Sequence, residues 1–264
     1  MKNRFLSAGL LLAITLLCLL LSELSRVLLA AVVGIICCYE LSSQLEKLQV
    51  YCSAWVMFVY IASQALLALL HAGPMAYLGS FLCAVYLAML SGILRKRVSG
   101  NGALDTVAGL GYPAFLFASW MMILVSELWL QTLAIACVST WICDTAAFFG
   151  GSAFGRHKLA PAISPKKTVE GALCGALSSL PVGALLSLAP FMRGFSLPVC
   201  VISALVASSL GQVGDLAESL LKRMIGVKDF SDLIPGHGGL FDRVDSLLFS
   251  IPAAYLCLTL AALL

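Results

Sequence analysis

Long uncharged apolar runs alternate with short polar connections along this chain. Nine runs stand out, at 5–22, 27–39, 48–70, 74–94, 106–126, 128–143, 171–192, 194–214 and 246–264. A helix that crosses a bilayer needs about 20 predominantly apolar residues. The second run reaches this length only with Leu24 and residues beyond Tyr39, the sixth must extend through Asp144 towards Phe149, and the eighth towards Leu221. The pattern predicts an all-α, polytopic integral membrane protein with about nine transmembrane helices.

The organisation of the chain follows from what is missing between these runs. No internal repeat and no low-complexity linker is evident in the sequence. We therefore expect a single membrane domain over 1–264, with front helices over 1–126 and a second half, 127–264, that carries both long polar loops. The first apolar run lacks a convincing small-residue cleavage site, so we interpret it as a retained span.

Composition narrows the class of protein further. The 264 residues are 61% hydrophobic and 11% charged, whereas soluble domains are about 45–50% apolar and about 25% charged. This excludes a soluble globular enzyme, a disordered protein and a secreted disulfide scaffold. The ten cysteines form no C-x-x-C pair, so we interpret them as small buried hydrophobic residues. A net charge of +3 is too small to indicate nucleic-acid binding.

The distribution of basic residues predicts the orientation. With nine spans, fourteen of the sixteen Lys and Arg residues fall on the side of the N-terminus, and only Arg26 and Arg193 fall on the other. Cytoplasmic loops carry the excess of Lys and Arg. We therefore predict a cytoplasmic N-terminus, an external C-terminus, and a cytoplasmic location for both polar loops.

Acidic residues concentrate in and beside those two loops. With Asp232 left aside, seven of the thirteen lie there: Asp144, Glu170, Asp215, Glu218, Asp229, Asp242 and Asp245. Residues three apart share a helix face, which pairs Asp215 with Glu218 and Asp242 with Asp245. Ionised carboxylates near a bilayer persist where they pair, line a wet cavity or bind a cation. Together with nearby Lys and Arg they suit a Mg²⁺–phosphate site; the alternative is a set of interfacial charges that end the helices.

Two glycine-rich segments differ in what they indicate. Gly150 and Gly155 have P-loop spacing, but Arg156 and His157 follow where Lys and Ser or Thr belong, so we reject that motif. The segment 235–239 has three glycines in four positions, which lets backbone N–H groups approach a phosphate. It also suits a flexible turn into the last span, and both interpretations can hold together.

The second polar stretch resembles a known signature. Residues 219–245 are similar to the signature of phosphatidate cytidylyltransferases, the CDP-diacylglycerol synthases. The residues that carry the resemblance are Ser219-Leu220-Leu221-Lys222-Arg223, Lys228-Asp229-Phe230-Ser231 and Ile234-Pro235-Gly236-His237-Gly238-Gly239-Leu240-Phe241-Asp242-Arg243-Val244-Asp245. Asp144-Thr145-Ala146-Ala147 and Ser164-Pro165-Lys166-Lys167-Thr168-x-Glu170-Gly171 resemble a second region of the same family. The specific motifs cover roughly 144–245, and the front half is hydrophobic in a compatible way.

The resemblance implies a reaction and its partners. CTP and phosphatidic acid would give CDP-diacylglycerol and pyrophosphate with Mg²⁺, a second cation being left open. It further implies a homodimer that contacts membrane lipid. The protein would be a multi-pass protein of a bacterial inner (plasma) membrane, with its active site facing the cytoplasm. No nucleic acid is implied as a partner.

The candidate site residues follow from this chemistry and the resemblance. We assign catalysis to Asp215, Asp242, Lys222, Arg243 and Lys167. For the metal we assign Asp215 and Asp242 as main ligands, with Asp144, Glu218 and Asp245 as further ligands or their partners. The substrate phosphates are assigned to Ser164, Lys166, Lys167, Lys222, Arg223, Lys228, His237, Gly238, Gly239 and Arg243.

Two alternatives to this function stay open. One is a CTP-dependent transferase acting on another lipid phosphate or on a polyprenol. It stays open because the apolar residues that would contact the lipid tail cannot be assigned from the sequence. The other is an ion or solute transporter. Transport favours ionisable residues near the membrane midplane and related halves, whereas here the ionisable residues gather on one side and no repeat is seen.

Overall fold

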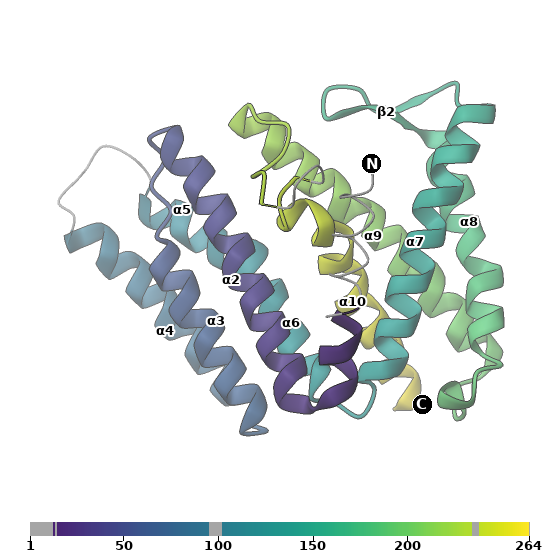
Figure 1. Ribbon diagram of the computed structural model, residues 1–264, viewed down its shortest axis with the longest axis horizontal. Helices are drawn as coiled ribbons and strands as arrows, with labels where there is room; N and C mark the ends of the chain where they lie inside the picture. Colours follow the sequence, from purple (N-terminus) through teal and green to yellow (C-terminus); the bar gives the residue numbers. More distant parts are fainter. Residues whose placement is uncertain (1–12, 14, 95–101, 234–237, 264) are drawn as a thin grey trace. The chain divides into compact units, whose positions relative to one another are not determined.

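A computed structural model describes residues 13, 15–94, 102–233 and 238–263 of the chain, and helices dominate this part (Figure 1). The helices are α2 (Glu23–Lys47), α3 (Ala54–Leu69), α4 (Pro74–Leu94), α5 (Gly102–Gly109), η1 (Leu110–Ala114), α6 (Phe115–Leu124), α7 (Trp129–Phe154), α8 (Val169–Leu186), η2 (Pro190–Met192), α9 (Leu197–Ile225) and α10 (Phe241–Ala262). Two strands, β1 (Lys158–Ala160) and β2 (Ser164–Thr168), pair antiparallel.

The predicted spans correspond closely to these helices. Seven helical segments of the described residues are long and apolar enough to cross a membrane, namely α2, α4, Gly102–Leu124, α7, α8, α9 and α10. The expected extensions of the second, sixth and eighth runs are confirmed by α2, α7 and α9. The run 48–70 contains the 16-residue α3, and half of the run 5–22, residues 5–12 and 14, lies outside the described residues. The all-α class is confirmed, while the count of nine stays a prediction.

Two local features differ from a simple succession of apolar helices. The span Gly102–Leu124 is interrupted at Tyr112, whose φ of −145° and ψ of 117° are not helical. Pro113 follows directly, and proline removes a helical hydrogen bond and disfavours the helical conformation in the residue before it. The polar connection that follows α7, expected as a loop, instead forms the β1–β2 hairpin, with Lys158 opposite Thr168.

The described chain forms two compact units, each treated by itself. The first comprises Met1–Val125 and Val227–Arg243. In it α2 packs against α3 and α6, and α3 packs against α4. Its interior contains Cys37 and Cys38, both fully buried. All ten cysteines are free thiols, and five of them are buried as predicted, whereas four are half-buried and Cys83 is exposed.

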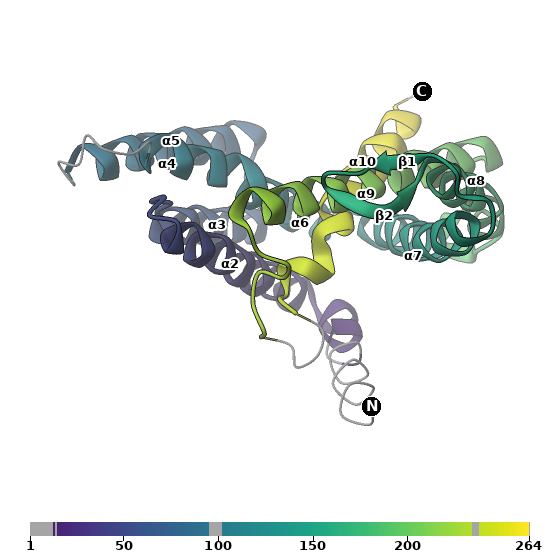
Figure 2. The ribbon, with the colours of Figure 1, turned by 90° about the horizontal axis from the view of Figure 1, so that it is seen from above.

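The second unit comprises Ser126–Gly226 and Val244–Leu264. In it α7 and α8 lie side by side, and both contact α9 (Figures 1 and 2). Small residues let the backbones approach: a Cβ atom on Gly175 of α8 would lie 2.8 Å from the carbonyl oxygen of Cys143 in α7. The hairpin joins the end of α7 to the start of α8, so it lies at one end of this helix group. The prediction of one membrane domain is left as a prediction.

Candidate active site

The second unit brings together charged side chains from four elements. Lys167 of β2 forms an ion pair with Asp215 of α9, and both side chains are a little under one-third exposed (29% and 28%). Asp144 of α7 and Asp245 of α10 both lie close enough to Asp215 for their charges to interact. Four residues that the sequence analysis selected from separate motifs are therefore neighbours in one cluster.

Close packing of α9 on α10 explains why Asp215 and Asp245 meet. Gly214 immediately precedes Asp215, and a Cβ atom on Gly214 would lie 2.6 Å from the carbonyl oxygen of Asp245. Any side chain at position 214 would therefore force the two helices apart. Because glycine has no side chain, the turn of α9 that carries Asp215 can approach the turn of α10 that carries Asp245.

The hairpin places Lys167 by local hydrogen bonds. Thr168 caps the N-terminus of α8, its Oγ1 accepting from the Gly171 N–H at 3.1 Å, an interaction that satisfies one of the unpaired N–H groups at a helix start. Glu170 accepts from the backbone N–H of Arg156 at 3.1 Å and contacts His157 Nδ1 at 2.6 Å. These contacts tie both ends of the hairpin to the first turn of α8.

A second carboxylate–ammonium pair lies one helical turn from Asp215. Lys222 Nζ is 2.6 Å from Glu218 Oε2, and the Glu218 side chain is fully buried while that of Lys222 is 13% exposed. Lys222 also interacts electrostatically with Asp245. Buried charges are retained where they are paired, so this pair extends the cluster into the interior of the unit.

The remaining predicted residues of this unit lie on or beside the hairpin. Ser164 is half-buried and Lys166 is exposed. Arg223 is exposed, and its Nε donates to the carbonyl oxygen of Ile163 at 3.1 Å. Arg223 therefore links the end of α9 to the turn of the hairpin.

The first unit holds the rest of the predicted site. Asp242, at the start of α10, is buried and one of its oxygens, Oδ2, accepts from the N–H groups of Phe230 at 3.1 Å and Gly239 at 2.9 Å. Gly238 has a φ of +82°, a conformation that favours glycine. Lys228 and Arg243 are exposed, and His237 lies outside the described residues.

Sequence reasoning missed one residue of this part, Glu40 of α2. It is 4% exposed, and its carboxylate accepts from Ser231 Oγ at 2.5 Å and from the backbone N–H of Phe241 at 2.8 Å. Its sequence signal is a carboxylate directly after the apolar run 27–39 of α2, where a charged side chain close to the membrane is costly.

The donor chemistry of the charged cluster suits a hard divalent cation. Asp144, Asp215 and Asp245 supply carboxylate oxygens, the ligands that Mg²⁺ prefers, and their mutual charge interactions would be offset by a cation. Among residues 13, 15–94, 102–233 and 238–263, however, no three Asp, Glu, His or Cys side chains are grouped as a complete metal site. The residues therefore fit Mg²⁺ by ligand type, and the metal assignment stays a prediction.

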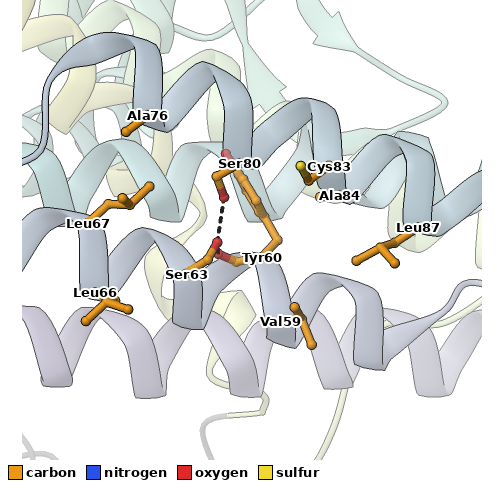
Figure 3. Close-up of a pocket in the computed structure, with 10 residues that line it drawn as sticks. All are labelled: Val59, Tyr60, Ser63, Leu66, Leu67, Ala76, Ser80, Cys83, Ala84 and Leu87. Carbon is orange, nitrogen blue, oxygen red and sulfur yellow. Dashed lines mark hydrogen bonds between the residues drawn. The ribbon is translucent and has the colours of Figure 1, made fainter.

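A groove elsewhere in the first unit has a different character. It lies between α3 and α4, is lined mostly by apolar side chains, and is crossed by a 2.6 Å hydrogen bond between Ser63 Oγ and Ser80 Oγ (Figure 3). No charged side chain is among its lining residues. The groove therefore offers no charged group that could hold a phosphate.

The fold defines a multi-pass membrane protein, and its second unit carries a cluster of carboxylates and lysines. A family model described as "Cytidylyltransferase family" matches residues 2–261. The chain belongs to the cytidylyltransferase family.

Named relatives agree with this assignment. A phosphatidate cytidylyltransferase of Brucella suis biovar 1 is 33% identical over 260 residues, which cover 97% of this chain and 92% of the relative. The phosphatidate cytidylyltransferase of Bacillus subtilis is 43% identical over 129 residues, covering 47% of this chain and 46% of the relative. The resemblance drawn from the signature residues is confirmed.

Proposed function

We propose that this chain transfers CMP from CTP to phosphatidic acid, giving CDP-diacylglycerol and pyrophosphate. The observation that carries the proposal is the charged cluster of Lys167, Asp215, Asp144 and Asp245. It lies in a chain that the cytidylyltransferase family model matches over residues 2–261. Membership of an enzyme family disfavours the transporter alternative.

The reaction requires positioning and charge neutralisation more than proton removal. A phosphate oxygen of the lipid attacks the α-phosphorus of CTP, a new P–O bond forms, and the bond from the α-phosphorus to the bridging oxygen breaks to release pyrophosphate. The lipid phosphate is already anionic, so no deprotonating base is needed. Such transfers rely on groups that hold the phosphates and balance their charge.

The basic residues supply that balance in our proposal. Lys167 and Lys222 hold the reacting phosphates, because their ammonium groups lie within the charged cluster, beside Asp215 and Glu218. The exposed residues assigned to the outer phosphates and the lipid headgroup are Lys166, Arg223, Lys228 and Arg243, together with Ser164. Gly238, Gly239 and His237 keep their predicted contribution to phosphate binding.

We assign the Mg²⁺ site to the carboxylates. Asp215, Asp144 and Asp245 would hold the ion in the second unit, with Glu218 beside them. Asp242, at the start of α10 in the first unit, keeps its predicted role as a metal ligand. Mg²⁺, when bound, would neutralise phosphate charge and polarise the phosphoryl oxygens. A second cation is compatible with the number of carboxylates.

The decisive experiment follows labelled CTP into lipid. Detergent-solubilised protein is incubated with phosphatidic acid, with and without Mg²⁺, beside the Asp215→Asn variant. A Mg²⁺-dependent lipid product that the variant does not form supports both the reaction and the site. If folded wild-type protein forms product only with another lipid phosphate or a polyprenol, that alternative replaces phosphatidic acid.

We further propose that the hairpin and its cluster face the cytoplasm, because the basic residues concentrate on that side. Lys166 precedes α8 and Arg193 follows it, so a crossing by α8 puts them on opposite sides. In Arg193→Cys and Lys166→Cys variants, an impermeant thiol reagent added outside intact cells should label position 193 above the wild-type background and leave position 166 unlabelled. The reverse pattern overturns this orientation.

The homodimer implied by the family resemblance is also a proposal. Chemical cross-linking in native membranes should give a band of twice the monomer mass. A protein that remains monomeric in mild detergent and in membranes overturns it.

A further inference from the structure

The signature segment is held by a residue far away in the sequence. Glu40 Oε1 accepts from Ser231 Oγ at 2.5 Å and from the Leu240 N–H at 3.0 Å, and Oε2 accepts from the Phe241 N–H at 2.8 Å. These contacts span 191 to 201 residues of chain. One carboxylate of α2 therefore contacts both ends of the segment 231–241.

The position of Glu40 suits the start of α10. The first N–H groups of a helix have no partner within it, and the helix start carries partial positive charge. Leu240 and Phe241 stand at that start, and both donate to Glu40. A buried carboxylate on α2 thus completes a helix end that belongs to the signature.

Neighbouring contacts leave little freedom for this arrangement. Gln44, one turn after Glu40, donates its side-chain N–H to the carbonyl oxygen of Phe230. A Cβ atom on Gly239 would lie 2.9 Å from both Glu40 oxygens and 3.0 Å from Asp242 Oδ2. The glycine thus lets the loop backbone pass directly beside the two carboxylates.

We propose that Glu40 is a positioning residue for the transfer reaction. It fixes Ser231 and the first turn of α10, and through that turn Asp242 and Arg243, which are predicted to bind the metal and a substrate phosphate. This inference rests on the proposed function for its kinetic consequence, while the anchoring itself can be measured without activity.

Kinetics with matched variants test the proposal. Glu40→Ala removes both acceptor oxygens and the three hydrogen bonds that they accept, and Glu40→Gln keeps one acceptor oxygen. Glu46→Gln, an exposed carboxylate of the same helix, is the control. Because a misplacement of about 1 Å can cost about a hundredfold in rate, we expect kcat to fall up to about a hundredfold in Glu40→Ala, less in Glu40→Gln, and not at all in the control. The midpoint of thermal unfolding in Glu40→Gln should stay within a few degrees of the control.

A double-mutant cycle separates positioning from a general loss of structure. Ser231→Ala should lower kcat several-fold in the wild-type background and leave it unchanged when added to Glu40→Ala, because the same contact is already gone. Additive losses, or activity that merely follows the folded fraction, overturn the proposal.

Hydrogen exchange keeps the inference distinct from the proposed function. The amides of Leu240 and Phe241 should exchange faster in Glu40→Ala than in wild type or Glu46→Gln. If wild-type protein transfers no CMP but this difference appears, the function fails and the anchoring holds. Unchanged exchange of both amides overturns the anchoring whatever the activity.

Discussion

Lys167 and Asp215 form an ion pair although 48 residues separate them. One lies on a two-stranded hairpin and the other within a long apolar helix. The pair joins a residue of the motif 164–171 to a residue that precedes the signature 219–245, a contact that the sequence alone does not show. Its surroundings, with Asp144 and Asp245 in charge-interaction range, make Asp215 the centre of the cluster.

Replacement of Asp215 by Asn should abolish most of the activity. The change removes the charge that pairs with Lys167 and interacts with two further carboxylates, and loss of a preorganised charged group commonly costs about 10²–10³ in rate. CDP-diacylglycerol formation should therefore fall at least about a hundredfold. Glu127→Gln, an exposed carboxylate of the same unit, is the control, and near-normal turnover in Asp215→Asn would remove this residue from the site.

The two adjacent lysines of the hairpin should differ in their effects. Lys167 is half-buried and paired with Asp215, whereas Lys166 is exposed. We expect Lys166→Ala mainly to raise the KM for CTP, and Lys167→Ala to lower kcat as well. Lys158→Ala, an exposed lysine of β1, serves as the comparison. Equal effects of the Lys166 and Lys167 variants on both constants would contradict the pairing.

The Glu218–Lys222 pair should contribute to stability as well as to activity. Removing one partner of a buried pair costs about 3–5 kcal/mol, so Lys222→Met should lower the midpoint of thermal unfolding in detergent. The double variant Glu218→Leu with Lys222→Met should recover most of that stability and remain inactive. A single variant as stable as wild type would show that the pair is not the buried interaction described here.

Gly214→Ala should destabilise the protein, against the usual trend. Alanine in place of glycine within a helix normally stabilises by about 0.5–1 kcal/mol. Here the added Cβ would lie 2.6 Å from the Asp245 carbonyl oxygen, so α9 must move from α10 and carry Asp215 with it. We expect a lower unfolding midpoint and at least about tenfold less activity.

Gly79 of α4 provides the matched control, because a Cβ atom there meets nothing within 4 Å. Gly79→Ala should leave activity unchanged and the midpoint equal or slightly higher. If the two alanine variants behave alike, the close approach of α9 and α10 is not what holds Asp215 in place.

Much of the fold could be predicted because it depends on local pattern. A helix in a membrane satisfies its backbone hydrogen bonds within itself, so an apolar run of sufficient length already specifies a helix. That reasoning located the runs that became α2, α7 and α9, including their extensions past Tyr39, Asp144 and Asp215. It missed the β1–β2 hairpin, whose short strands carry no apolar alternation.

The sequence by itself determined the class of protein, the family and the residue types of the site, because hydropathy and short motifs involve neighbours along the chain. Tertiary structure alone decided that Lys167 pairs with Asp215 and that Glu40 holds Leu240 and Phe241. These contacts join residues 48 to 201 positions apart. They exist because the folded chain brings polar groups of distant segments within hydrogen-bonding distance, as where Gly239 lets the loop backbone pass beside Glu40, and polar groups removed from water are stabilised by having partners.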